Sequence, residues 1–371
     1  MTRVTPERLV RLLSAPAVEW RQLVDLQPAA FCQLCDEHGI TALVADRLTV
    51  RDAGLGAHDP LLALLRERAW QEAALDVVRE RDLKHLAAAL DAVGVAPLVI
   101  KGAHLAYVCY PRPDLRPRVD TDLLIDPTDR NRAASVLSAL GYDEAPQSGG
   151  DLLMYQVSYE RKAAGVRTHV VDLHWRISNA QRFGGCLSHA EILSEAEPIA
   201  ALHPAVGPSA VHAVILACVH RVAHHLDVPR LVWSYDLHLL GQRLTRSEWD
   251  RVATLAIERR VAAACHRSLV GAAALFGEGI PAMPLAALAD AARGERGSDD
   301  YLDASRPHIH RVLADLRALD SWADRWRLAW QHLFPAPGYM RSVYAPASRA
   351  PLALLYLRRA WWGARRWVAH S

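Results

Sequence analysis

Apolar side chains recur at three- and four-residue intervals through residues 5–95, and charged side chains occupy many of the positions between them. This spacing is typical of amphipathic helices that bury one face. It predicts a helix around Leu9 and longer helices over residues 31–43 and 61–93. Gly94 follows the last of these runs and is expected to end the third helix, because glycine readily adopts the left-handed backbone angles of a helix terminus.

From residue 96 the period shortens, and brief apolar runs alternate with glycine, proline and polar residues. Such runs predict β-strands, and the longer segments between them predict helices. The proline-rich stretch at 112–117 cannot continue the helix before it. The predicted strands cover residues 97–100, 119–125, 155–161 and 168–175, the last two paired around a turn at 163–165, and the predicted helices cover 102–110 and 127–140, ending at Gly141.

The remainder of the chain, from residue 188, again shows helical spacing, interrupted by prolines and by a polar loop at 294–300. The fold class is therefore predicted to be α+β, a small mixed sheet with helices packed on it and helical segments on both sides. We expect an N-terminal helical segment (residues 1–95), an α/β core (residues 96–180) and a C-terminal helical domain (residues 181–371).

The last predicted helix combines Trp361, Trp362 and Trp367 with arginines at 358, 359, 365 and 366. Aromatic and basic residues on one helix are typical of elements that bind membrane surfaces or nucleic acids. The simpler interpretation, and the one we expect, is a terminal helix that packs on the protein and exposes an arginine-rich side.

Composition adds few constraints. Charged residues make up 23% of the chain and hydrophobic ones 51%, and a net charge of +2 gives no reason to expect binding of long nucleic acid. We find neither the apolar core of a signal peptide nor an apolar stretch of about 18 residues, so we expect a cytoplasmic protein without a transmembrane segment. Cys32 and Cys35 lack a second Cys or His pair at zinc-finger spacing, and we expect them to be buried thiols.

Three carboxylates lie on two of the predicted strands. Asp120 and Asp122 belong to the run Arg-Val-Asp-Thr-Asp-Leu-Leu-Ile at 118–125, and Asp172 to the run Val-Val-Asp-Leu-His-Trp at 170–175. Residues two apart on a strand share a face, and a lone carboxylate is costly to bury in an apolar strand. A divalent cation would relieve the repulsion, and Mg²⁺ binds carboxylates together with substrate phosphates. The pattern indicates metal-dependent phosphoryl or nucleotidyl transfer. The alternative is that Asp120 and Asp122 face solvent and Asp172 caps a helix or forms an ion pair.

A turn suited to phosphate binding precedes these strands. Gly102 would let the backbone approach a phosphate at the start of a helix, and Lys101 would supply a counter-charge. Arg112, Arg116 and Arg118 crowd the following loop, and we expect Arg118 to contact phosphate or the aspartates.

These motifs together resemble the polymerase-β-type nucleotidyltransferase superfamily, and more closely its largely uncharacterised bacterial branch, nucleotidyltransferase family 5. The strand with Lys101-Gly102, the Asp-x-Asp strand and the strand carrying Asp172 are the most specific features. Weaker similarities lie at residues 37–40, 230–236, 333–335 and 340–341, so the resemblance covers most of the chain. One departure is Ala103, where the superfamily usually has serine or glycine after the first glycine of the turn.

The resemblance implies an enzyme that uses a nucleoside triphosphate (NTP) and Mg²⁺, with two ions expected and Mn²⁺ as the alternative. Asp120, Asp122 and Asp172 would bind the metal and act in catalysis. The nucleotide would contact Lys101, Gly102, Ala103, Arg118 and His174, the last sharing a strand face with Asp172.

The acceptor is not readable from the sequence, and near-neutral charge favours a small molecule or a peptide over a long nucleic acid. Two other functions stay open: a nucleotide-binding regulatory or toxin–antitoxin-type module with little turnover, and a nucleotidyltransferase that modifies a protein or tRNA. His220, His224 and His225 have helical spacing that could bind a transition metal, but we expect a polar helix face near the cleft. We also expect this face and residues 230–236 to approach the aspartates, with Trp233 or Tyr235 near the acceptor or in the core.

Overall fold

The computed structural model describes residues 6–14, 27–50, 59–147, 149–277, 279–344 and 350–368. Its described part contains a mixed sheet with the strand order β3-β4-β5-β2-β1-β7-β6. Strand β2 lies at the centre, parallel to β5 and antiparallel to β1. The strands are β1 (Leu98–Ile100), β2 (Thr121–Leu124), β3 (Asp143–Glu144), β4 (Gln156–Ala163), β5 (Val166–His174), β6 (Glu197–Pro198) and β7 (Val206–Gly207).

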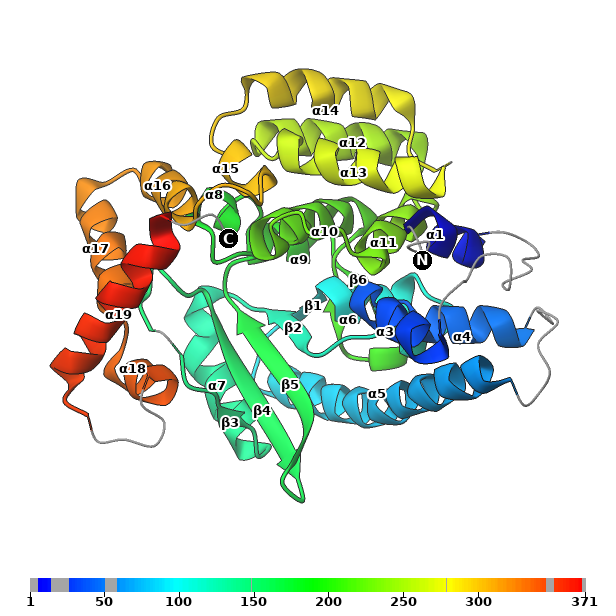
Figure 1. Ribbon diagram of the computed structural model, residues 1–371, viewed down its shortest axis with the longest axis horizontal. Coiled ribbons are helices and arrows are strands. Elements are labelled where there is room, and N and C mark those ends of the chain that lie inside the picture. Colours follow the sequence, from blue (N-terminus) through cyan, green and yellow to red (C-terminus); the bar gives the residue numbers. More distant parts are fainter. Residues whose placement is uncertain are drawn as a thin grey trace.

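Both faces of the central strands are buried, which explains why β1 is apolar throughout. Val99, Leu123 and Leu173 pack in one hydrophobic cluster with residues of the long helix α5 (Pro60–Ala92). Leu98, Ile100 and Leu124 pack in another, with residues of α10 (Ala210–His225) and the helices beyond it. Figure 1 shows the sheet between these two layers, with α5 below it and α10 above.

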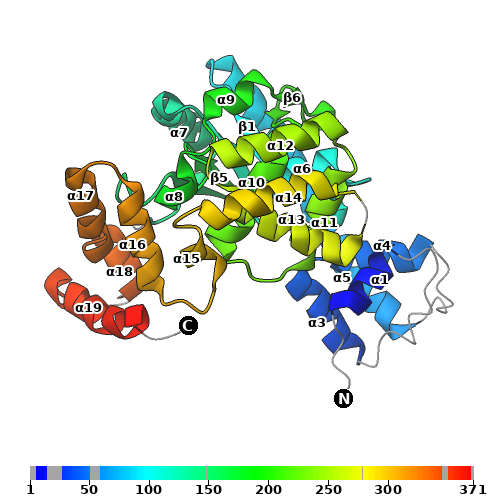
Figure 2. The ribbon, with the colours of Figure 1, turned by 90° about the horizontal axis from the view of Figure 1, so that it is seen from above.

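The other helices surround this core (Figures 1 and 2). Those of the N-terminal part pack against α5 and the start of α11, and those of the C-terminal part follow α10. The α-helices are α1 (Pro6–Ser14), α3 (Pro28–His38), α4 (Thr41–Val50), α6 (Lys101–Val108), α7 (Arg130–Ala139), α8 (Gln181–Gly184), α9 (His189–Ser194), α11 (Leu231–Gly241), α12 (Arg246–Glu258), α13 (Ala262–Phe276), α14 (Ala282–Gly294), α15 (Asp299–Leu302), α16 (His308–Ala318), α17 (Trp322–Leu333), α18 (Pro337–Tyr344) and α19 (Leu352–Val368), and the 3₁₀ helices are η1 (Pro113–Leu115), η2 (Pro127–Asp129) and η3 (Ala200–Leu202).

The predicted α+β class is confirmed, as are the β4–β5 hairpin and the helix end near Gly94, where φ is +70°. The single helix predicted over residues 31–43 is wrong. Gly39 has φ of +67° and separates α3 from α4, because a left-handed residue cannot continue a helix. The division into three parts stays a prediction; β7 and β6 extend the sheet beyond residue 180.

Cys32 and Cys35 are free and buried on α3, as expected. Among the described helices, none has the length and apolar character needed to cross a membrane. The first five residues and the side chains of Trp362 and Trp367 lie outside the described part of the chain.

Candidate active site

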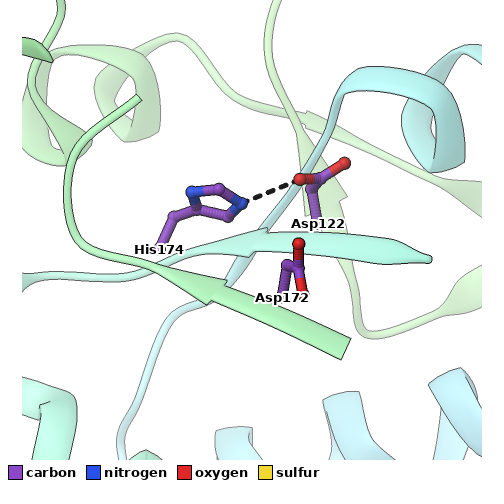
Figure 3. Close-up of side chains that lie close together, drawn as sticks. All are labelled: Asp122, Asp172 and His174. Atoms are coloured by element: carbon purple, nitrogen blue, oxygen red, sulfur yellow. Dashed lines mark hydrogen bonds and ion pairs between the residues drawn. The ribbon is translucent and has the colours of Figure 1, made fainter. Parts of the chain in front are cut away.

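The parallel register of β2 and β5 brings two of the predicted carboxylates together. Asp122 is the direct partner of Asp172, and Leu124 is the partner of His174. Side chains alternate between the two faces of a sheet along each strand. The side chains of Asp122, Asp172 and His174 therefore lie on the same face as Leu124, the face that packs against α10. Figure 3 shows the three side chains converging above β2 and β5.

Oxygen and nitrogen atoms of these three residues lie close enough to hold one metal ion. One ligand atom from each of Asp122, Asp172 and His174 lies within 4.8 Å of the others. Asp120, which immediately precedes β2, is outside this group. Burial, followed by the charges of Asp122 and Asp172, raises the pKa of Asp120 to about 6. The site therefore concentrates negative charge that a divalent cation would stabilise.

Lys101 supplies a positive charge to the same group. Its Nζ donates to Asp122 Oδ1 at 2.6 Å and lies 3.3 Å from His174 Nε2, and both Lys101 and Asp122 are buried. Burial alone would raise the pKa of Asp122, but Lys101 and the bond with His174 (2.8 Å) hold it well below its usual range. The lysine backbone has φ of +54°, a left-handed conformation that costs a non-glycine residue about 1–2 kcal/mol. Such strain is typical of functional positions.

Strand β4 orients Asp172. Ser158 Oγ donates to Asp172 Oδ1 at 2.6 Å, and Gln156 Nε2 donates to Oδ2 at 3.1 Å. Asn179 Nδ2 in turn donates to Gln156 Oε1 at 3.2 Å. We did not predict these residues. The hairpin was the available signal, but regular pairing back from its turn would place Val157 opposite Asp172. An irregularity between Arg161 and Lys162 shifts the register by one residue and brings Ser158 there instead.

Arg116, and not the predicted Arg118, lies beside the glycine turn. A Cβ atom on Gly102 would lie 3.1–3.3 Å from the Arg116 guanidinium. That guanidinium donates to both carboxylate oxygens of Asp236, which also accepts from Tyr110 at 2.7 Å. The motif at residues 230–236 thus reaches the turn through Asp236.

Arg118 points toward α5 instead. It pairs with Asp76 there, and its guanidinium lies over the ring of Tyr107. In the described part of the chain, no ion pair joins Arg118 to the carboxylate group near Asp122. Ala103 is fully buried in the hydrophobic cluster on the α5 side of the sheet. A serine hydroxyl at that position would therefore face apolar side chains.

A histidine group on α10 faces the same site. His220 Nε2 lies 3.0 Å from His225 Nε2, and His225 stacks on Trp233 of α11 with ring centroids 4.1 Å apart. Burial and then the Lys101 charge lower the pKa values of His220 and His224 well below their ordinary value, which favours the neutral form of each ring. Among the described residues, the three histidines do not form a metal-ligand group of their own.

The site combines paired carboxylates, a buried lysine and imidazole rings on and above two adjacent parallel strands. Carboxylates in this arrangement can hold a divalent ion and accept a proton from a hydroxyl group.

A comparison with curated proteins gave no match. The family model described as "uncharacterised nucleotidyltransferase" matches residues 25–277, which include every residue of the site. The match spans more than half of the chain, so the protein belongs to this nucleotidyltransferase family.

Proposed function

We propose that the protein is a metal-dependent enzyme that transfers a nucleoside monophosphate from an NTP to a hydroxyl or phosphate group of an acceptor and releases pyrophosphate. One observation carries the proposal: β2 and β5 run parallel in the register that pairs Asp122 with Asp172. The same arrangement supports a relationship to the polymerase-β-type superfamily. The near-neutral charge of the whole chain favours a small molecule or a peptide as acceptor.

The donor atoms fit a divalent metal ion. Two carboxylates suit Mg²⁺, and the imidazole of His174 makes Mn²⁺ an alternative, since Mn²⁺ accepts mixed oxygen and nitrogen ligands more readily. Asp120 is the remaining carboxylate available to a second ion. When bound, the metal would supply Lewis-acid stabilisation of phosphate charge.

Side chains of the protein would accept the acceptor's proton and bind the triphosphate. Asp172, oriented by Ser158 and Gln156, can accept the proton of an acceptor hydroxyl. Lys101 can release Asp122 when a metal binds and turn its ammonium to the triphosphate. Arg116 and Asp236 hold the turn at Gly102 so that its backbone N–H groups stay available to phosphate.

The α10 face would line the acceptor side. The Nε2 atom of His224 and the Nδ1 atom of His220 are buried without a hydrogen-bond partner among the described residues. Buried imidazole nitrogens without partners are costly, and a polar acceptor beside Asp172 would satisfy them. Trp233 stacks on His225 and supports this wall from α11.

A second function is favoured by the same lysine. Because Lys101 already neutralises Asp122, the site could bind a nucleotide without metal and without turnover, as a regulatory or toxin–antitoxin-type module would. Modification of a protein or tRNA is a third, and it would need a basic surface near the site.

Labelling of a cell extract separates these functions. The protein is incubated with each labelled NTP, MgCl₂ or MnCl₂, and extract, and labelled products are identified by mass. We expect one labelled acceptor and release of pyrophosphate, both lost in Asp122→Asn and Asp172→Asn but kept in Asp143→Asn, which changes an exposed aspartate on β3. Nucleotide binding without any labelled product would favour the regulatory module, and labelled protein or tRNA would favour the third function.

A further inference from the structure

The C-terminal part of the chain differs from the rest in charge and aromatic content. Residues 321–371 contain eight arginines, no lysine and one acidic residue, Asp324, a formal charge of +7. The whole chain carries +2, so residues 1–320 carry −5. The same segment contains six of the eleven tryptophans. Such charge asymmetry indicates an interaction with an anionic surface. The segment also lies beyond residue 277, where the family match ends.

Helix α17 exposes a row of tryptophans. Trp322, Trp326 and Trp330 are 73%, 74% and 63% exposed, and their four-residue spacing places them along one side of the helix. The helix is anchored by Leu328, its one fully buried residue among those described. Large aromatic side chains are rarely left in water as a contiguous row unless they bind something.

Helix α19 adds a second apolar row. Leu354, Leu357 and Trp361 are 57%, 67% and 67% exposed at helical spacing, while Leu355 packs inward. Ring contacts connect the two helices: the centroid of Phe334 lies 4.2 Å from that of Trp330 and 5.6 Å from that of Tyr356. Figures 1 and 2 show α17, α18 and α19 together at one end of the molecule.

We propose that α17 and α19 bind the surface of an anionic lipid membrane, with the two apolar rows in the headgroup region. Tryptophan and leucine on one side of a helix, with arginines beside them, are typical of helices that lie in a membrane interface. Arginines would contact lipid phosphates, and tryptophan is enriched at the boundary between headgroups and acyl chains.

Other partners fit these residues less well. Nucleic-acid bases stack on aromatic rings, but leucines such as Leu354 and Leu357 would gain nothing from bases or phosphates. A second copy of the chain would place two strongly basic segments against each other, and like charges at an interface cost several kcal/mol. A lipid surface accepts both the aliphatic and the basic side chains.

Vesicle cosedimentation tests the proposal. We expect the full-length protein to sediment with phosphatidylcholine vesicles that contain phosphatidylglycerol, and about tenfold less with phosphatidylcholine alone or at high salt. The double variant Trp322→Ala/Trp326→Ala should lower the partition coefficient about tenfold or more, since two exposed aromatic surfaces are removed.

The matched control is Trp70→Ala. Trp70 is 72% exposed on α5, in the acidic part of the chain, and its loss should leave vesicle binding unchanged. Because all three tryptophans are exposed, each variant should keep the wild-type circular dichroism spectrum and unfolding midpoint. Nucleotidyl transfer in the absence of vesicles should also be unchanged, so the proposed function can fail without affecting this inference.

Three results would overturn the inference. One is the absence of binding to anionic vesicles, and another is an equal loss of binding in Trp70→Ala. The third is a tryptophan-dependent complex with single-stranded RNA, or a tryptophan-dependent dimer in sedimentation velocity, without vesicle binding.

Discussion

Replacing Lys101 by methionine tests whether this lysine takes the place of a metal ion at the carboxylates. The substitution keeps the unbranched apolar stem of the side chain and removes the ammonium. The Nζ and Oδ1 atoms of this pair are 2.6 Å apart, and the two side chains are 6% and 9% exposed. Breaking a buried ion pair by removing one partner costs about 3–5 kcal/mol, because the other charge stays buried without compensation. We expect the free energy of unfolding to fall by about this amount.

Divalent metal should reverse part of the loss. Metal bound to the folded state stabilises it by an amount that grows with the ratio of metal concentration to dissociation constant. In the wild type the ion must displace the ammonium from Asp122, whereas in Lys101→Met it need not. We therefore expect MgCl₂ or MnCl₂ to raise the unfolding midpoint in urea more for the variant than for the wild type.

Lys84→Met is the control. Lys84 Nζ also lies 2.6 Å from a carboxylate, that of Glu80, but the two side chains are 43% and 34% exposed. Exposed helix pairs of this kind contribute about 0.3–0.5 kcal/mol. The reasoning would be refuted if Lys101→Met and Lys84→Met unfolded at the same urea concentration, or if metal stabilised the wild type more than Lys101→Met.

Three further predictions concern packing, pH and acceptor recognition. Gly207→Ala should cost about 2–3 kcal/mol in urea unfolding, because the added Cβ would lie 2.8 Å from Nε2 of the buried His104. Burial raises the pKa of Asp315 from 3.8 to about 6, so the folded state holds this proton more tightly than the unfolded state; stability should fall by about 2 kcal/mol as pH rises from about 4 through 6, and Asp315→Asn should remove that dependence in unfolding measured across pH. His224→Gln or Trp233→Phe should change acceptor selectivity while nucleotide affinity in calorimetry stays constant; a matching loss of nucleotide affinity would place this wall at the nucleotide instead.

Local patterns were sufficient to predict the elements that carry the site. Alternation and turn residues defined the hairpin of β4 and β5, and the apolar run before Lys101 defined β1. The two-residue spacing of Asp172 and His174 then predicted that their side chains share one face of their strand. What spacing could not give was the parallel pairing of β2 with β5, which brings Asp122 opposite Asp172.

Partner choice over long distances was not predictable. Three arginines compete for the carboxylates near the turn, and only the packed structure directs Arg116 to Asp236 and Arg118 to Asp76. The break at Gly39 was also missed, since apolar spacing continues across it and a left-handed glycine leaves no mark on that pattern. Whether Arg118 contacts substrate, as we expected from the sequence, stays a prediction.

The position of the transferred label tests the central claim most directly. The wild type and Asp172→Asn are incubated with extract, MgCl₂ or MnCl₂, and an NTP that is labelled in either the α-phosphate or the γ-phosphate. Nucleotidyl transfer predicts that α-label reaches the acceptor and γ-label appears only in pyrophosphate, with both signals lost in Asp172→Asn. Transfer of γ-label to the acceptor, or full activity of Asp172→Asn, would contradict the account.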